Sequence, residues 1–495
     1  MKITAMRRWQ PRPGAAIGWR PTTRCADAAA DAPPTGRPLT FLTENHVRSS
    51  QMARANGQPH RSYLGSGTEL DGDLDVEAMT AALEAFVRRH PILRSWFTCA
   101  DGAIRHHLVA PEDVAFVSES LGSIDDVDHL HQHLCDRFGA ETISDAFPGF
   151  AFGAVAHDGG FAIYFGCDHA LSDGASQALA LTEIADLYTG IVDGSADLDG
   201  GSDDSYFDHA ELDAMSAGHH MNSPEADAWR NTFSRNGLRM PGFPLDLGIA
   251  PGETAPVRPL EMSMLDRAGV ASFDAVCKAA GGSFLSGIHA AMAIAGYELG
   301  GSTYHYGMIV SNTRAMHPDF AGAQGWFCSF APVEVDIATA TEFTSLIPAA
   351  YTAQQESKRL ATVPVQAAMA AMVAAGAPDT AVVTAPNLLS YIDFRWFPGN
   401  GKPAFDRGVI FTGEGRTANA SVWINRDHDS LYLGSQTPDT PFAQRQVRRY
   451  FDRLCAVVAD VARHGDHVIS PPVDADALRR IDVRPQERAL ARHDH

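Results

Sequence analysis

Two kinds of segment are missing from this sequence of 495 residues: paired cysteines and long apolar runs. The seven cysteines show no Cys-x-x-Cys spacing and are odd in number, which is typical of reduced thiols. No stretch reaches about 18 consecutive apolar residues, the length that a membrane-spanning helix needs. The beginning of the chain also lacks the run of about 7 to 15 apolar residues that forms the core of a signal peptide. We therefore expect a cytoplasmic protein.

Positive charge is scarce as well. The 39 lysines and arginines face 60 aspartates and glutamates, which gives a formal net charge of −21. A surface of this sign disfavours nucleic acid or an anionic membrane as the main partner. Gly281 and Gly282 are not followed by the Gly-Lys-Ser/Thr ending of a phosphate loop, so no nucleotide hydrolysis is expected. Hydrophobic residues make up 45% of the chain, enough for two or three domains with substantial cores.

The most informative segment that is present runs from Asp168 to Gly174, Asp-His-Ala-Leu-Ser-Asp-Gly. The apolar residues over 160–166 predict a buried strand before it, and apolar residues at helical spacing over 178–187 predict a helix after it. Gly174 is placed to ease a tight turn between them, and such a junction presents a side chain into a cleft. His169 is the candidate general base for acyl transfer, since an imidazole has an ordinary pKa near neutral pH.

Each residue around this junction also has a structural interpretation. On the bare residues, His169 is as easily a core histidine as a base. Asp173 can orient the imidazole, although an aspartate beside a glycine at a turn more often makes a structural ion pair. Cys167 has the apolar strand context of an inert buried thiol rather than a nucleophile. The candidate donors to an oxyanion are backbone amides near Gly174 and the hydroxyl of Ser176, and the sequence does not choose between them.

The pattern His-x-x-x-Asp-Gly after an apolar strand resembles the active-site motif of the coenzyme-A-dependent acyltransferase superfamily, which includes chloramphenicol acetyltransferase and the condensation domains of nonribosomal peptide synthetases. Condensation domains usually carry a second histidine directly before the catalytic one, where this chain has Asp168. Other segments resemble the polyketide-associated (Pap) acyltransferases of actinobacterial glycolipid synthesis, and they recur in the expected order over nearly the whole chain. These segments are Trp-Gln-Pro-Arg-Pro-Gly at 9–14, 88–97, Ser-Asn-Thr-Arg at 311–314, Gly-Trp-Phe at 325–327, 390–395 and Pro-Asp-Thr at 438–440.

The resemblance implies an α/β (α+β) fold of two chloramphenicol-acetyltransferase-like sandwich domains, each a mixed sheet flanked by helices, with a channel between them. His169 would lie in mid-channel, with the thioester donor entering from one face and the acceptor from the other, and without an acyl-enzyme intermediate. Arg314 matches the family arginine that pairs with the motif aspartate, which would make Asp173 chiefly structural, with Gly174 as part of the same motif. Trp326 lies in a segment that the resemblance places near the crossover between the halves, where it can line the channel.

We expect one domain over 1–215, a second over 216–475, and a tail over 476–495. The acidic segment 192–213 predicts a solvated loop near the boundary, because its carboxylates miss the calcium-binding spacing of an EF-hand. Ser223 followed by Pro224 predicts the start of a helix.

Two sets of histidines outside the motif are better explained by structure than by chemistry. His129 and His133 lie one helical turn apart, but no carboxylate or cysteine partner is evident, so a surface helix explains them better than a metal site. His219 and His220 mimic a double-histidine signature, yet Pro224 stands where the aspartate would be needed. No metal is expected.

The expected function is an acyltransferase that moves a fatty or polyketide acyl group from a thioester to a hydroxyl of a sugar, such as trehalose, or of a lipid precursor. Acyl-coenzyme A or the phosphopantetheine of a polyketide synthase carrier protein would be the donor, as a substrate rather than a cofactor. Arg395, Arg416 and Arg426 are conceivable contacts for its phosphates, although solvated surface arginines explain them better. Lipid products can bring the enzyme to the inner face of the membrane. Two alternatives stay open: a noncatalytic condensation-like binding module and an amide-forming condensation enzyme.

Overall fold

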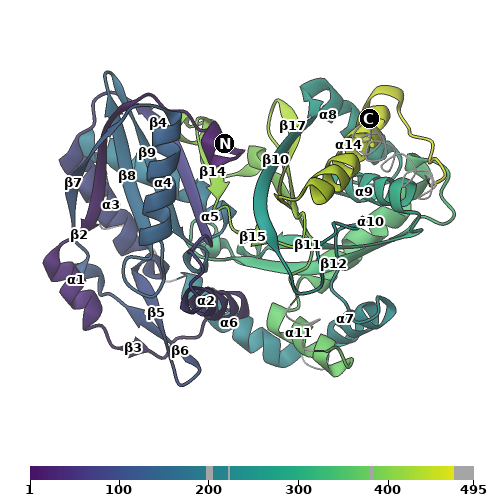
Figure 1. Cartoon of the computed structure of the whole chain (residues 1–495), viewed down its shortest axis with the longest axis horizontal. Coiled ribbons are helices and arrows are strands. Elements are labelled where there is room, and N and C mark those ends of the chain that lie inside the picture. Colours follow the sequence, from purple (N-terminus) through teal and green to yellow (C-terminus); the bar gives the residue numbers. More distant parts are fainter. Residues whose placement is uncertain (197–204, 221–222, 379–383, 473–495) are drawn as a thin grey trace, which may run out of the picture.

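The computed structural model describes residues 1–196, 205–220, 223–378 and 384–472. Figure 1 shows two lobes side by side, one built mainly from the first half of the chain (purple to blue) and one from the second (teal to yellow). Each lobe contains a seven-stranded sheet that combines parallel and antiparallel pairs. Helices cover the sheets, so the architecture is the α/β arrangement that the sequence predicts.

The first lobe is organised around a strand that ends at the motif histidine. This strand, β9, is buried at every position, and it lies between β4 and β8 in the middle of the sheet. The predicted strand over 160–166 is therefore confirmed and extends two residues further. The sheet order is β1 (Lys2–Ile3), β14 (Val409–Thr412), β4 (Tyr63–Asp71), β9 (Gly160–Asp168), β8 (Phe150–His157), β2 (Gly14–Pro21), β7 (Phe116–Ile124).

Helices cover both faces of the first sheet. Two of them, α3 (Val76–Arg89) and α5 (Gly174–Val192), share one apolar core with the sheet, while α4 (Val127–Glu141) packs on the opposite face. Beside this sandwich lie α1 (Thr23–Ala30), α2 (Phe41–Ala55) and a small sheet of β3 (Pro34–Thr35), β6 (Ala103–Leu108) and β5 (Ser95–Ala100).

The second lobe repeats the sheet-and-helix plan. Its sheet order is β12 (Cys328–Asp336), β11 (Tyr304–Asn312), β13 (Leu388–Asp393), β16 (Val422–Arg426), β17 (Ser430–Pro438), β10 (Ala255–Asp266), β15 (Arg416–Thr417). Its core is shared with α8 (Arg267–Ala279), α9 (Phe284–Gly300), α10 (Phe343–Leu360) and α14 (Pro441–His464). A smaller core joins α7 (Pro224–Arg235) and α11 (Val365–Ala374).

The two lobes exchange structure across the predicted domain boundary at 215/216. Helix α6 (Ser205–His220) spans that boundary, and Figure 1 shows it at the base of the molecule between α2 and α11. Strand β14 comes from the second half but pairs with β4 in the first sheet, where it satisfies backbone groups that would otherwise form an open edge. The chain therefore does not divide into two independent units at 215. The predicted tail over 476–495 lies outside the described residues.

The acidic segment differs in part from the predicted loop. Residues 197–204 lie outside the described part, but Asp208, Glu211 and Asp213 lie on α6 rather than in a loop. The helix forms because Tyr206, Phe207 and Ala210 share one buried face. The predicted helix start is confirmed, since the Ser223 side chain accepts a hydrogen bond from the Ala226 amide at the first turn of α7.

Within the described ranges, no single helix is long and apolar enough to cross a membrane. One pair of consecutive helices, α8 and α9, meets the length and composition requirement together, but the two are bent by 92° at the break between them.

Candidate active site

His169 lies at the turn that joins β9 to α5, as the sequence predicts. It begins a short 3-10 turn, η4 (His169–Leu171), directly after the last residue of the strand. Its backbone amide donates to the Ser62 carbonyl at 3.0 Å, which fixes the turn against the segment before β4. The Asp173 side chain then caps α5 by accepting from the Ser176 amide at 2.7 Å. A buried strand and a capped helix therefore hold the histidine from both sides.

Gly174 has a different role from the predicted one. Its φ lies outside the left-handed region, and a Cβ built at this position would meet no atom within 4 Å. The turn therefore does not require glycine, because the tight geometry is supplied by η4 and the Asp173 cap. The space beside the first turn of α5 is open, and Gly174 and Ala175 are both partly accessible.

The imidazole of His169 has one buried nitrogen and one open nitrogen. Nδ1 is buried and has no partner outside residue 169 itself among the described residues, whereas Nε2 is not among the buried, unpartnered atoms. Burial, followed by the nearby His46, lowers the pKa of His169 to about 4. The side chain is therefore neutral at pH 7, and Nε2 can accept a proton there.

Trp326 covers His169 from the second half of the chain. The centroids of the two rings lie 4.1 Å apart at an interplanar angle of 39°. The centroid of the same indole lies 5.7 Å from that of His46, with the two rings nearly perpendicular. Trp326 therefore forms part of the wall around the histidine, which agrees with the predicted place of this residue near the crossover between the halves.

Asp173 does not orient His169 but connects the two lobes. Its carboxylate accepts from the Arg314 guanidinium at 2.8 and 3.0 Å and from the Phe327 amide at 2.9 Å. Asp173 and Arg314 are 3% and 6% exposed, so the ion pair is almost completely buried. Burial opposes ionisation of Asp173, but Arg314 and the two amides outweigh it and lower the pKa of the carboxyl. The contacts of Asp173 therefore agree with a structural ion pair rather than with a residue that orients the imidazole.

Ser176 is not available as the donor to an oxyanion. Its fully buried hydroxyl donates to the Gly325 carbonyl at 2.7 Å and accepts from the Arg314 guanidinium and the Gly325 amide. The hydroxyl has one proton, which is already used. The sequence-based proposal for Ser176 is corrected here: the side chain supports the contact between the lobes.

Sequence reasoning missed a histidine and aspartate pair beside His169. Asp168 is fully buried, and its Oδ1 accepts from His46 Nε2 on α2 at 2.7 Å. His60 Nε2 lies 3.8 Å from the other carboxylate oxygen. His46 and Asp168 are 122 residues apart, so no spacing pattern connects them. The only signal was an aspartate at the end of a strand buried on all sides, which requires a partner.

His209 is a second residue that the sequence did not single out. It projects from α6 into the contact between the lobes and packs against Phe327, with ring centroids 4.9 Å apart. Burial lowers its pKa to about 4, so it is a neutral core histidine behind the Asp173 and Arg314 pair.

A groove runs along α5 between the two lobes. It consists of two adjoining cavities of about 630 and 480 Å³, which share Arg89, Glu183 and Gly322. The first lobe contributes Arg89 and residues of α5, and the second lobe contributes residues 317–323 and 398–402. Together these volumes are of the size that holds a small-molecule ligand. Neither cavity is lined by His169, His46 or Trp326, so the groove adjoins the same helix as the motif without enclosing the histidine.

The other candidate side chains are committed to structural contacts. Cys167 is buried, which raises the pKa of its thiol well above the ordinary value, so it is not a nucleophile. Arg395 binds both oxygens of Asp393 at 2.8 and 2.6 Å, and Arg416 binds Thr254. Arg426 is buried and lies over the Phe284 ring at 4.3 Å, so Arg395 and Arg426 are engaged within the protein, whereas Arg416 is exposed.

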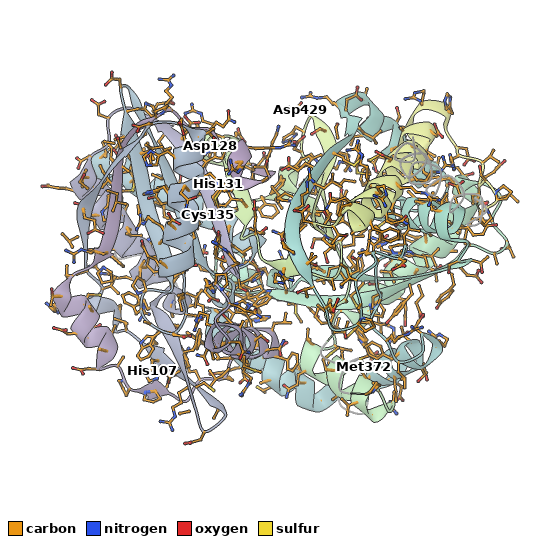
Figure 2. All side chains as sticks on the ribbon, in the orientation of Figure 1. His107, Asp128, His131, Cys135, Met372 and Asp429 are labelled. Atoms are coloured by element: carbon orange, nitrogen blue, oxygen red, sulfur yellow. The ribbon has the colours of Figure 1, made fainter. Side chains whose placement is uncertain are left out.

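The described residues contain no group of three or more histidine, cysteine, aspartate or glutamate side chains arranged for a metal ion. Figure 2 labels His131 and Cys135, which lie one turn apart on α4, with His131 Nε2 and Cys135 Sγ 3.6 Å apart. On another side of α4, His133 Nε2 hydrogen-bonds with the buried Tyr164 hydroxyl at 2.8 Å. His129 faces Asp125, so the two histidines of the sequence analysis do not share a site.

A family model of the condensation domain matches residues 50–370, which include the motif, the Arg314 contact and Trp326. This chain belongs to the condensation-domain family. Asp168 lies within the matched residues, whereas its partner His46 lies just before them.

Relatives with known names extend the match over nearly the whole chain. The 2'-acyl-2-O-sulfo-trehalose (hydroxy)phthioceranyltransferase PapA1 of Mycobacterium tuberculosis (strain CDC 1551 / Oshkosh) is 28% identical over 94% of this chain and 89% of its own length. The trehalose-2-sulfate acyltransferase PapA2 of Mycobacterium bovis (strain BCG / Pasteur 1173P2) is 26% identical over 92% of this chain and 96% of its own length. The predicted resemblance to the Pap acyltransferases is confirmed, and the chain is an acyltransferase.

Solved structures support the fold. A PapA2 acyl transferase superposes with a TM-score of 0.82 at 24% identity, over 93% of this chain and all of that chain. The first condensation domain of the calcium-dependent antibiotic synthetase superposes with a TM-score of 0.64 at 17% identity, over 86% and 98% of the two chains. The predicted fold of two chloramphenicol-acetyltransferase-like lobes is confirmed.

Proposed function

We propose that this enzyme transfers a fatty or polyketide acyl group from a thioester to a hydroxyl of a trehalose-derived sugar or a related lipid precursor, with His169 as general base. The observation that carries the proposal is the neutral imidazole of His169, whose Nε2 is open beside a wall from the other lobe. The names of PapA1 and PapA2 support the choice of a trehalose-based acceptor, since both relatives act on sulfated trehalose compounds.

The reaction requires two proton transfers, one from the acceptor hydroxyl to His169 and one from His169 to the leaving thiolate. The hydroxyl oxygen of the acceptor attacks the thioester carbonyl carbon while His169 Nε2 takes the hydroxyl proton. When the tetrahedral intermediate collapses, the carbon–sulfur bond breaks and Nε2 returns the proton to the departing thiolate. A low pKa makes the imidazole a weak base, so orientation of the two substrates contributes more, about 7 to 11 kcal/mol. A larger contribution from orientation than from base strength is consistent with a site held between two lobes.

The oxyanion of the tetrahedral intermediate needs hydrogen-bond donors near His169. The backbone amides of Gly174 and Ala175 open the helix α5, and neither donates a hydrogen bond within the part of the chain that the structure describes. Both residues are partly accessible, and the positive end of the helix dipole lies there. These two amides are the donors that we propose in place of Ser176.

The donor is acyl-coenzyme A or an acyl carrier protein, whose pantetheine arm would enter the groove along α5. The combined groove has the volume for such an arm, and residues of both lobes line it. The donor is a substrate, and the proposal involves no further cofactor or metal. We place the reaction in the cytoplasm, with lipid acceptors reached at the inner face of the membrane.

The test mixes the purified enzyme with a long-chain acyl-coenzyme A and a panel of acceptors that includes trehalose and trehalose 2-sulfate. Release of free thiol is followed together with the mass of the product. Wild type is expected to form an acylated sugar, and folded His169→Ala is expected to lose activity by about 10²- to 10⁴-fold.

Other outcomes would support the alternatives. Acyl binding without turnover by any coenzyme A or carrier-protein donor would favour a noncatalytic binding module. A product formed only with amine acceptors would favour an amide-forming condensation enzyme. Either result would overturn the proposed transfer to a hydroxyl.

A further inference from the structure

Asp168, directly before the motif histidine, carries a buried charge that the mechanism above does not use. Its side chain is completely buried. Oδ1 accepts from the Ala170 amide at 2.7 Å and from His46 Nε2 at 2.7 Å, and Oδ2 lies 3.4 Å from the Ser144 amide. A buried carboxylate is strongly destabilising unless it is paired, so the contact with His46 is a structural requirement for keeping Asp168 ionised.

The contact with Asp168 fixes the orientation of His46. A carboxylate only accepts hydrogen bonds, so Nε2 must carry a proton, and Nδ1 points away from Asp168. The His46 side chain is 13% exposed, and Nδ1 has no hydrogen-bond partner among the described residues, yet it is not among the buried, unpartnered atoms. Asp168 and His46 thus have the arrangement in which a carboxylate orients an imidazole.

The oriented ring of His46 touches both parts of the site that matter for His169. Its centroid lies 5.9 Å from that of His169 and 5.7 Å from that of Trp326, with the His46 and Trp326 rings nearly perpendicular at 84°. Trp326 in turn packs against His169, with ring centroids 4.1 Å apart at a tilt of 39°. The three rings form one cluster. Among the described residues, Asp168 is the only carboxylate that hydrogen-bonds with one of these rings.

His169 itself lacks such a carboxylate. The motif aspartate, Asp173, is bound by Arg314 and the Phe327 amide, and it makes no hydrogen bond with His169. The orientation and charge state of the base must therefore come from its other neighbours.

We propose that His46 is a positioning residue of the active site, held by Asp168, which braces Trp326 over His169. This inference rests on the proposed function, because it assigns a role in the reaction of the same site. The ring of His46 acts on the reaction through His169 and Trp326, and it exchanges no proton with the substrates. Burial is the largest cause of the low pKa of His169, and the nearby His46 lowers that pKa further.

Other charged groups that face this cluster do not replace His46. Arg54 lies two turns further along α2 but is paired with Asp145. His60 faces Asp168 from the segment before β4, and burial lowers its pKa, so it is neutral. Asp168 and Asp173 both raise the pKa of His169, and His46 is the described side chain that acts on this pKa in the opposite direction.

The test compares wild type with His46→Gln, whose side-chain amide can still donate to Asp168 but has no charge and no ring. The measurement is the pH dependence of kcat/KM with an acyl N-acetylcysteamine thioester, a donor without titrating phosphates. We expect kcat to fall by about 10- to 100-fold, the range observed when an orienting partner is lost from a preorganised site. We also expect the acidic midpoint of kcat/KM to move to higher pH, because His169 gains protons more easily.

A second variant, Asp168→Asn, keeps an acceptor for His46 but removes the carboxylate. If the two residues act as a pair, the double variant loses no more activity than the worse single variant. The matched control is His467→Gln in the second lobe, where a buried histidine pairs with Glu298 at 3.2 Å far from the motif. This control is expected to lower stability and leave the midpoint unchanged.

The results separate the two proposals. An inactive wild type would contradict the proposed function itself. An active wild type, with a folded His46→Gln whose acidic midpoint stays at the wild-type value, would overturn the positioning role alone. Additive losses in the double variant would show that Asp168 and His46 do not act as a pair. If His46→Gln does not fold, the midpoint measured with Asp168→Asn decides, because a midpoint equal to that of wild type would also overturn the role.

Discussion

Two buried aspartates flank His169 and differ in what they hold. Asp173, four residues after the histidine, binds Arg314 and the Phe327 amide from the second half of the chain. Asp168, one residue before it, binds His46 from α2 within the first lobe. The first aspartate joins the lobes, and the second builds the immediate surroundings of the base. The aspartate that belongs to the motif is therefore the one further from the chemistry.

The comparison shows that the partner, rather than the place in the motif, decides what a buried carboxylate does. Both carboxylates overcome the burial that opposes their ionisation, but one does so with a guanidinium and the other with an imidazole. A guanidinium stays charged at every accessible pH, so the Asp173 pair is a permanent link. The imidazole of His46 lies beside the rings of His169 and Trp326, so the Asp168 pair reaches the site of the reaction.

Removing the link between the lobes should have the largest effect on stability. Asp173→Ala leaves the Arg314 guanidinium buried without its partner, which destabilises the fold by about 3 to 5 kcal/mol. Urea unfolding measures this change in the free energy of unfolding. A variant that keeps wild-type stability but loses activity would instead place Asp173 in catalysis and remove the difference between the two aspartates.

Ser176→Ala tests the same link more gently. Loss of the hydroxyl leaves a buried guanidinium nitrogen and the Gly325 amide with fewer partners, which we expect to lower stability by about 1 to 3 kcal/mol. The value of kcat measured on the folded variant should stay near that of wild type. A loss of about 10²- to 10³-fold in kcat at unchanged stability is the signature of an oxyanion donor, and it would reinstate Ser176 in that role.

Cys167→Ala examines the strand that leads to His169. The thiol is buried beside Gln177 and Ser172, so its loss should lower stability by about 1 kcal/mol through a small cavity. Turnover should remain, because burial keeps the thiol protonated. Complete loss of turnover in a folded variant would point to a covalent intermediate on sulfur, which mass spectrometry of the acylated enzyme would detect.

Gly174→Ala should have the smallest effect on stability. The backbone conformation is open to any residue, and the new methyl group meets no atom within 4 Å. Thermal unfolding should show a change within about 1 kcal/mol, in the stabilising direction, because alanine favours a helix over glycine. A strongly destabilised variant would show that the turn after the motif does need glycine.

Local patterns in the sequence predicted much of the site, because they arise from neighbours along the chain. The buried strand, the turn at His169 and the start of α5 follow from an apolar run, a polar cap and helical spacing. The pairing of Asp173 with Arg314 came from the family resemblance, since 141 residues separate the two. The fold of two lobes was predicted in the same way.

Contacts that depend only on packing could not be predicted. His46 approaches Asp168 because α2 crosses the end of β9, and no spacing in the sequence records that crossing. The same limit explains Ser176, whose hydroxyl is used by a carbonyl 149 residues away. The helix over 205–220 was missed because its first half belongs to the acidic segment 192–213, while its buried face depends on a few apolar side chains.

The central claim is that His169 acts as a neutral base at physiological pH. The most direct measurement is kcat/KM of wild type between about pH 5.5 and 8 with an acyl N-acetylcysteamine thioester, whose ionisation does not interfere. Burial and His46 lower the pKa of His169 to about 4, so the imidazole has already lost its proton below the measured range. The value of kcat/KM should therefore show no decline as the pH falls towards 5.5. A decline to half of the maximum near pH 6.5, the ordinary pKa of a histidine, would contradict the account.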